Sequence, residues 1–115
     1  MLLIGSPYLN LPKGVITMTD TPRQQAAKII NHYGAAHQQL KLCEECGELI
    51  QAAMKAYEQG CDITSDFVGE LADVYVLTLQ FIGYMPSVWL NEFNALVSFK
   101  LRRQLERIKE ESDDA

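Results

Sequence analysis

The sequence predicts an all-α protein built from four helices. Apolar residues recur at intervals of three and four positions along most of the chain, and no stretch shows the alternation typical of a half-buried strand. The breaks between these stretches coincide with residues that start or stop helices, namely Thr21-Pro22, Gly34, Gly60 and Pro86. We therefore expect one helical domain over residues 21–111.

Length and composition exclude several classes of protein. The chain has 115 residues, of which 48% are hydrophobic and 22% are charged, as in a soluble single-domain protein. Its net charge of −5 argues against binding to a nucleic-acid polymer. No apolar run approaches the roughly 20 residues that span a bilayer, and the first residues lack the features of a secretory signal. We expect a cytoplasmic protein that binds neither membrane nor nucleic acid.

The expected elements follow in order along the chain. Two glycines and two prolines interrupt residues 1–20, which are expected to form an extended N-terminal arm. Thr21 is a suitable cap for a helix that starts at Pro22, and Thr64 or Ser65 is a suitable cap for the third helix. The helices are expected at residues 22–33, 35–59, 65–85 and 87–111, with an acidic tail at residues 112–115.

Two pairs of carboxylates have the same spacing on neighbouring helices. Glu45 and Glu48 are three residues apart, and so are Glu70 and Asp73, so each pair lies on one helical face. Residues 67–79 are apolar almost all round, which predicts a helix buried on every side. Because burying a carboxylate costs several kcal/mol without compensation, these acids require a positive partner. A divalent metal ion is the simplest one, and Mg²⁺ suits oxygen ligands.

Simpler interpretations exist for some of these residues. Glu44, Glu45 and Glu48 could form a solvated helix face, but this explanation is weaker for the acids of the apolar third helix. The basic residues of the fourth helix could do no more than stabilise the helix dipole. Cys43 and Cys46 form a C-x-x-C pair, but nothing completes a zinc site, so we interpret them as small apolar residues. His32 and His37 are expected to be surface or capping groups.

The spaced acids resemble a known family. The pattern Glu44-Glu45-x-x-Glu48, followed after a gap by Glu70-x-x-Asp73, is similar to the E-E-x-x-E…E-x-x-D signature of the MazG-like all-α nucleotide pyrophosphohydrolases. Leu42, Gly47-Glu48-Leu49, residues 71–74 and residues 100–103 also resemble that family, and the similarity covers residues 30 to 110. Ser98 is a departure, because many members carry asparagine there.

The resemblance implies an enzyme that depends on Mg²⁺, with Mn²⁺ as an alternative. It would cleave a nucleoside triphosphate into a nucleoside monophosphate and pyrophosphate. The metal ligands would be Glu45, Glu48, Glu70 and Asp73. Glu44 and Glu45 would be the catalytic acids, with Glu44 as an auxiliary acid or water-orienting base. The resemblance also implies a helical bundle completed in a homodimer or homotetramer, and a small form similar to phage and prophage proteins.

Lys100 and Arg103 would contact phosphate. The residues alone already point to the fourth helix for this task, since Lys100 and Arg103 share one face and Arg107 extends the stripe by a turn. Side chains such as Gln38, Trp89 or Phe93 could select the base, and the spacing does not order them.

Two other functions remain alternatives at this stage. A ferritin-like dimetal protein needs Glu-x-x-His on two helices, and neither histidine lies three residues after a glutamate. A non-catalytic nucleotide-binding or helical interaction module would explain the helices, but it gives no reason for acids on the third helix.

Overall fold

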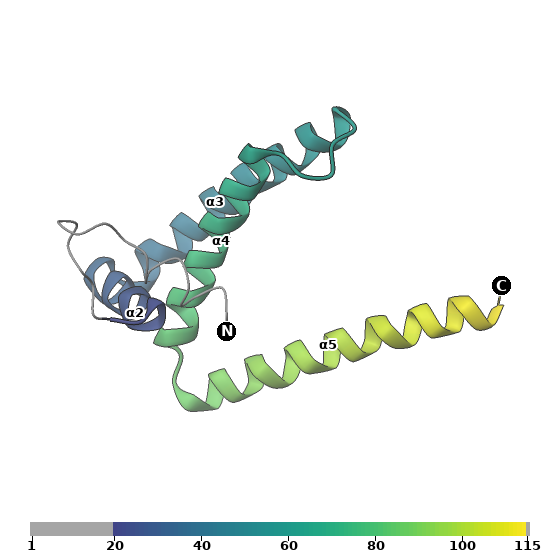
Figure 1. The fold of residues 1–115 in the computed structure, drawn as a ribbon. Coiled ribbons are helices and arrows are strands. Elements are labelled where there is room, and N and C mark those ends of the chain that lie inside the picture. Colours follow the sequence, from purple (N-terminus) through teal and green to yellow (C-terminus); the bar gives the residue numbers. More distant parts are fainter. Residues whose placement is uncertain (1–19, 115) are drawn as a thin grey trace. The chain divides into compact units, whose positions relative to one another are not determined.

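The computed structural model describes residues 20–114, which form four α-helices and contain no strand (Figure 1). The all-α prediction is therefore confirmed for this range, and residues 1–19 of the expected arm lie outside it. The helices are α2 (Pro22–Tyr33), α3 (Ala35–Glu58), α4 (Ser65–Tyr84) and α5 (Ser87–Asp114). None of them is both long enough and apolar enough to cross a bilayer.

Local interactions set the helix ends close to the predicted positions. The Thr21 hydroxyl accepts a hydrogen bond from the backbone N–H of Gln24 at 3.2 Å, and the Gln24 side chain accepts one from the N–H of Thr21 at 2.8 Å. This reciprocal capping box starts α2, with Pro22 at its first position. Gly34 has φ of +91°, which favours glycine, and it ends α2 one residue before α3 begins.

The later boundaries follow the same rules. Gly60 has φ of +70° just after α3, as expected for a residue that terminates a helix. The Thr64 hydroxyl accepts a hydrogen bond from the N–H of Phe67 at 3.1 Å, so Thr64 caps α4. Pro86 separates α4 from α5. These contacts join residues only a few positions apart, which is why the sequence predicts them well.

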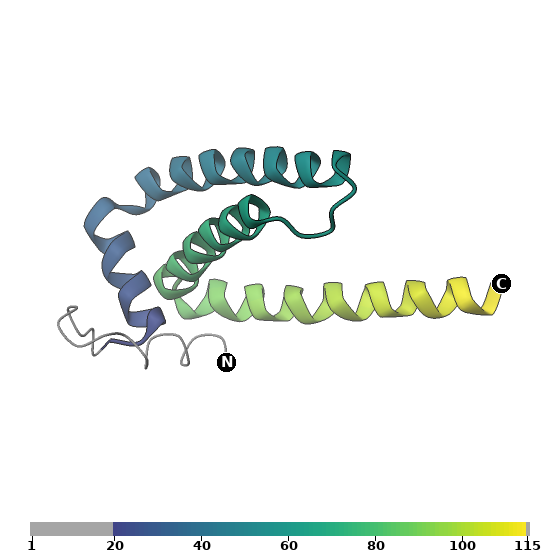
Figure 2. The same ribbon diagram turned by 45° about the horizontal axis from the view of Figure 1, so that its top comes forward.

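The chain divides into a unit that ends at Tyr84 and a second unit that begins at Met85. In the first unit, α3 and α4 lie side by side in opposite directions, and α2 packs chiefly against α4 (Figures 1 and 2). Among residues 20–84 of this unit the buried apolar residues are few: Ala26, Ile30, Ala56, Leu77 and Leu79. The acids of α3 and α4 therefore lie on a two-helix hairpin with a small core.

The structure corrects the expectation that residues 67–79 are buried on every side. Within the single chain, Val68 is 51% exposed, Leu71 50% and Tyr75 41%, and only Leu77, Leu79 and Gln80 of α4 are buried. The reason is that α2 and α3 together cover one side of α4. The other side of α4 is an apolar surface.

The second unit consists mainly of α5, and no residue of that helix is buried. Its regularly spaced apolar residues, Trp89 and Leu101 among them, are exposed in the single chain. The helix continues through Asp114, so residues 112–114 form its exposed last turn instead of the predicted tail. A four-helix bundle completed by oligomerisation stays a prediction.

Candidate metal centre

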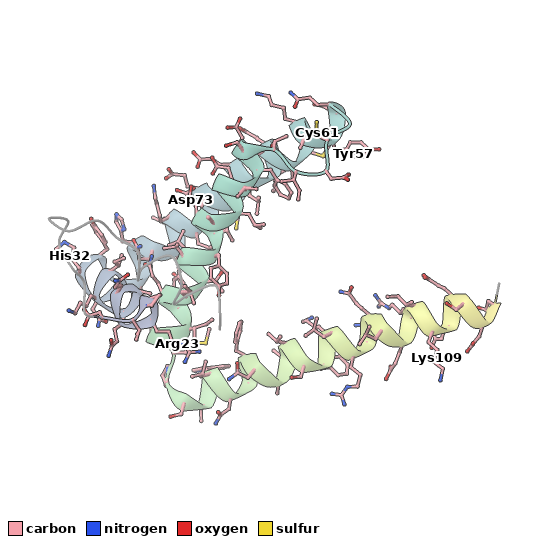
Figure 3. The ribbon with its side chains drawn as sticks, viewed as in Figure 1. Arg23, His32, Tyr57, Cys61, Asp73 and Lys109 are labelled. Carbon is pink, nitrogen blue, oxygen red and sulfur yellow. The ribbon has the colours of Figure 1, made fainter. Side chains whose placement is uncertain are left out.

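Three of the predicted ligands converge between α3 and α4. One carboxylate oxygen from each of Glu45, Glu70 and Asp73 lies within 4.8 Å of the other two. Figure 3 shows Asp73 midway along α4. Because the two helices run in opposite directions, residue 45 of α3 meets residues 70 and 73 of α4. Among residues 20–114 this is the one group of three or more acidic, histidine or cysteine side chains that converges in this way.

The cluster contains buried oxygens with no hydrogen-bond partner. Glu45 is only 8% exposed, and its Oε2 atom is buried without a partner among the described residues. The Oε2 atom of Glu70 is in the same state. Removing an ionised carboxylate from water costs several kcal/mol when nothing compensates it. Two such oxygens in one cluster of acids therefore fit the requirements of a cation.

Lys41 compensates part of this charge. Its Nζ atom lies 3.4 Å from Glu45 Oε1 and 3.2 Å from Glu44 Oε1. The hydrogen bonds to Glu44 and then Glu45 raise the pKa of Lys41 above its ordinary value. One ammonium group shared by two carboxylates does not neutralise a site that also contains Glu70 and Asp73. The cluster therefore keeps a negative charge.

Glu48, the fourth predicted ligand, lies at the edge of the cluster. It is exposed and is not part of the converging group. The pKa of Glu48 is raised above its ordinary value, first by a hydrogen bond with Glu45 and then by the negative charges of Glu45 and Glu70. The negative charge of the cluster therefore disfavours ionisation of Glu48.

The remaining predicted site residues lie elsewhere. Glu44 is exposed and bound to Lys41, outside the converging group. Lys100 and Arg103 are exposed on α5, in the second unit, and their contact with phosphate stays a prediction. Cys43 is exposed and Cys46 is half-buried, and neither belongs to the converging group.

A cavity of about 410 Å³ opens beside the cluster, toward the loop that joins α3 to α4. Glu48, Lys55, Asp66 and Glu70 are among the side chains that line it. The sequence interpretation gave no role to Lys55 or Asp66. Lys55 follows Glu48 by seven residues and so shares its helical face, which is the signal that could have identified it.

A second cavity, of about 180 Å³, lies on the opposite side of the cluster. Glu45 and Asp73 line it together with Gln38 and Gln80, which are 4% and 3% exposed. The sequence indicated Gln38 only as one possible base contact and gave no indication of Gln80. Each glutamine is seven residues from one of the acids, Gln38 from Glu45 and Gln80 from Asp73, so each pair shares a face.

Oxygen-only ligands determine the chemistry that this site can perform. Three converging carboxylates suit a hard cation such as Mg²⁺, Mn²⁺ or Ca²⁺, and the absence of histidine or thiol from the group disfavours zinc. The two flanking cavities leave space for a ligand on either side of the acid cluster.

Comparisons of the chain with protein-family models, with curated proteins and with solved structures found no match. The resemblance to the MazG-like enzymes therefore stays a hypothesis that depends on the spaced acids and their surroundings.

Proposed function

We propose that this protein is a Mg²⁺-dependent nucleoside triphosphate pyrophosphohydrolase, which releases a nucleoside monophosphate and pyrophosphate. The observation that carries the proposal is the pair of buried, unpartnered oxygens of Glu45 and Glu70 in a cluster with Asp73. Acids that are gathered at a cost in folding free energy are typical of functional sites. The spaced-acid motif supports the choice of reaction.

Glu45, Glu70 and Asp73 would hold the ion, and Glu48 would join them from the edge of the cluster. Mn²⁺ would fit the same ligands. A bound divalent ion supplies positive charge that attracts phosphate oxygens and stabilises the charge that develops during hydrolysis. The cluster thus allows an acidic protein to hold a polyphosphate.

Other side chains would orient water and phosphate. Glu44 lies next to the ligand set but outside it, and its ion pair with Lys41 holds its side chain beside Glu45. We assign it to orient the attacking water and accept its proton. Lys55 lines the cavity of about 410 Å³ and offers an ammonium group to the terminal phosphates, in addition to Lys100 and Arg103 of α5.

The proposed enzyme would be a homodimer or homotetramer. An open hollow of about 640 Å³ lies against the apolar surface of α4 and is lined by Val68, Leu71, Ala72, Val74, Tyr75 and Thr78. Exposed apolar surfaces of this kind are typical of protein interfaces. The three cysteines are free, and a nucleotide substrate favours a cytoplasmic location, to which we assign the protein.

Product analysis with defined nucleotides tests the proposal. The full chain is incubated with a panel of ribo- and deoxynucleoside triphosphates in Mg²⁺, in Mn²⁺ and in EDTA, and the products are separated by chromatography. We expect monophosphate and pyrophosphate in equal amounts with either metal, and none in EDTA. Release of diphosphate and inorganic phosphate would contradict the assigned bond cleavage. No metal-dependent product from any nucleotide would contradict the function.

A further inference from the structure

Two buried amides join α3 to α4 beside the acid cluster. Gln38 Nε2 donates a hydrogen bond to Gln80 Oε1 at 2.7 Å, across 42 positions of sequence. The two residues are 4% and 3% exposed, so both are almost completely removed from bulk water. Buried amides are costly unless their hydrogen-bonding groups are used, and the two together carry four N–H donors.

His37 sets the orientation of this pair. Its Nδ1 atom lies 2.6 Å from Gln38 Oε1, and because an amide oxygen only accepts, Nδ1 carries the hydrogen. The His37 ring is itself stacked on Tyr33, with 5.2 Å between ring centroids. With its oxygen bound to His37, Gln38 presents its NH₂ group to the oxygen of Gln80. The NH₂ group of Gln80 is then left without a partner among the hydrogen bonds of residues 20–114.

The amide pair and the acids form opposite ends of one cavity. Gln38 is two helical turns from Glu45, and Gln80 is two turns from Asp73, which places the ends about 10 Å apart along the helices. That separation matches the length of a nucleotide from its first phosphate to its base. The cavity volume of about 180 Å³ is below the roughly 300–1,000 Å³ of pockets that enclose whole ligands, so it suits one base.

We infer that Gln80, oriented by Gln38 and His37, donates hydrogen bonds to a carbonyl oxygen of the nucleobase and so selects 6-oxopurine and 4-oxopyrimidine nucleotides. The inference rests on the proposed function, because the acid cluster must hold the phosphates for the base to reach the amides. The NH₂ group of Gln80 can donate a hydrogen bond to a carbonyl oxygen of the base. It cannot pair with an exocyclic amino group, because that group also donates. A site discriminates most strongly between two ligands when the wrong ligand leaves a buried polar group of the protein without a hydrogen-bond partner.

Paired nucleotides that differ at this position provide the test. Inosine and adenosine monophosphates differ at the 6-position, and uridine and cytidine monophosphates differ at the 4-position. Their binding to the full chain in Mg²⁺ is measured by calorimetry, and the Gln80 side-chain amide is followed by ¹⁵N NMR. We expect the oxo member of each pair to bind about tenfold more tightly, as one additional hydrogen bond predicts, and to shift the Gln80 amide signal.

Gln80→Met keeps the length of the side chain but removes its donors, and we expect it to abolish the preference between the paired nucleotides. Gln39→Met, at an exposed position of the same helix as Gln38, is the matched control and should preserve the preference. A purely structural role would lower the melting temperature of Gln80→Met and leave the preference unchanged, which would overturn the inference. Tight binding by the amino members would also overturn it.

The corresponding triphosphates separate this inference from the proposed function. Metal-dependent pyrophosphate release from both triphosphates of a pair at equal rates, with equal binding of the two monophosphates, would overturn the base assignment and leave the function standing. If the wild-type protein neither binds these monophosphates nor releases pyrophosphate from the triphosphates, the proposed function and the base assignment both fail.

Discussion

At the residue scale, Glu45 is the side chain that connects the parts of the candidate site. It is 8% exposed, belongs to the converging group with Glu70 and Asp73, and forms an ion pair with Lys41. It also forms the hydrogen bond that raises the pKa of Glu48. An apolar side chain at this position could form none of these interactions.

Loss of one ligand charge should abolish metal-dependent activity. Glu45→Gln and Asp73→Asn each keep the shape of the side chain and remove a carboxylate from the group. Because changes to partners outside the ligand shell already cost about 10–100-fold, we expect loss of a ligand to weaken Mg²⁺ binding by at least about a hundredfold. Titration with Mn²⁺ and pyrophosphate release measure the effect, and circular dichroism should show unchanged helicity. Glu58→Gln, at the exposed end of α3, is the control; normal turnover in either ligand variant would contradict the site.

The crowding of acids predicts a stabilising substitution in the metal-free protein. Interactions with Glu45 and Glu70 raise the pKa of Glu48 in the folded state, so the folded chain holds this proton more firmly than the unfolded chain does. Stability is therefore lost as the pH rises through the raised pKa. Glu48→Gln cannot ionise, so its melting temperature in EDTA should exceed that of the wild type at pH 7 and approach it in acid, below the ordinary pKa of glutamate. A lower melting temperature at pH 7 would contradict the crowding.

At the scale of elements, the ends of the helices are determined by short-range chemistry. The capping box at Thr21 and Gln24, the left-handed glycines and the Thr64 cap each involve residues at most a few positions apart. The sequence predicted these boundaries to within about a residue for α2, α3 and α4, because the same residues act in any helix. Only the end of α5 was misplaced by several residues, since the charged segment after Lys109 contains no strong stop signal.

Two glycines should respond to alanine in opposite directions. Gly34 has φ of +91° and ψ of 148°, a combination that is strained for any other residue, so Gly34→Ala should lower the free energy of unfolding by about 1–3 kcal/mol. Gly47 lies within α3, with no atom within 4 Å of an added Cβ, so Gly47→Ala should raise it by about 0.5–1 kcal/mol. Urea unfolding monitored by circular dichroism measures both. A stabilised Gly34→Ala variant would show that the α2–α3 junction differs from the one described.

The basic stretch of α5 makes a separate prediction about phosphate. Lys100→Ala and Arg103→Ala should each weaken nucleotide affinity about ten- to a hundredfold, because each removes a charge-assisted hydrogen bond to phosphate oxygen. Mg²⁺ binding without nucleotide should be nearly unchanged. Arg107→Ala, one turn further along, is the internal comparison and should have a smaller effect. Equally mild effects of all three substitutions would assign phosphate binding to other residues, of which Lys55 is the first to test.

At the scale of the whole molecule, the main feature is the apolar side of α4 that is exposed in the single chain. Its outer surface exposes Val68, Leu71 and Tyr75, while its inner surface faces α2 and α3. We expect light scattering of the full chain to give a mass two or four times that of one chain. A monomer at micromolar concentration would contradict the proposed assembly.

Introducing a charge on this surface should dissociate the assembly. Leu71 is 50% exposed in the single chain, so Leu71→Glu should preserve helicity while opposing association through a buried, unpaired charge. Ile63→Glu, 72% exposed in the loop before α4, is the control and should keep the wild-type mass. If both variants keep that mass, the subunits associate through another surface.

The sequence by itself determined the helical class, the helix boundaries other than the end of α5, and the face on which each pair of acids lies. These properties depend on helical periodicity and on contacts within a turn, which operate before any tertiary packing exists. It also predicted Glu45, Glu48, Glu70 and Asp73 as one group, because the spacing of the first pair repeats on the adjacent helix, and three of these four acids converge in the structure.

Only the tertiary structure decided which side chains meet. The antiparallel packing of α3 on α4 places Glu45 opposite Glu70 and Asp73, buries it, and leaves Glu48 at the edge. The same packing brings Gln38 to Gln80. It also left one side of α4 open, where the apolar sequence predicted burial all round. These outcomes depend on the register between α3 and α4 and on how many helices pack against α4. Both are set by contacts between residues distant in sequence, and such contacts leave no local pattern in the sequence.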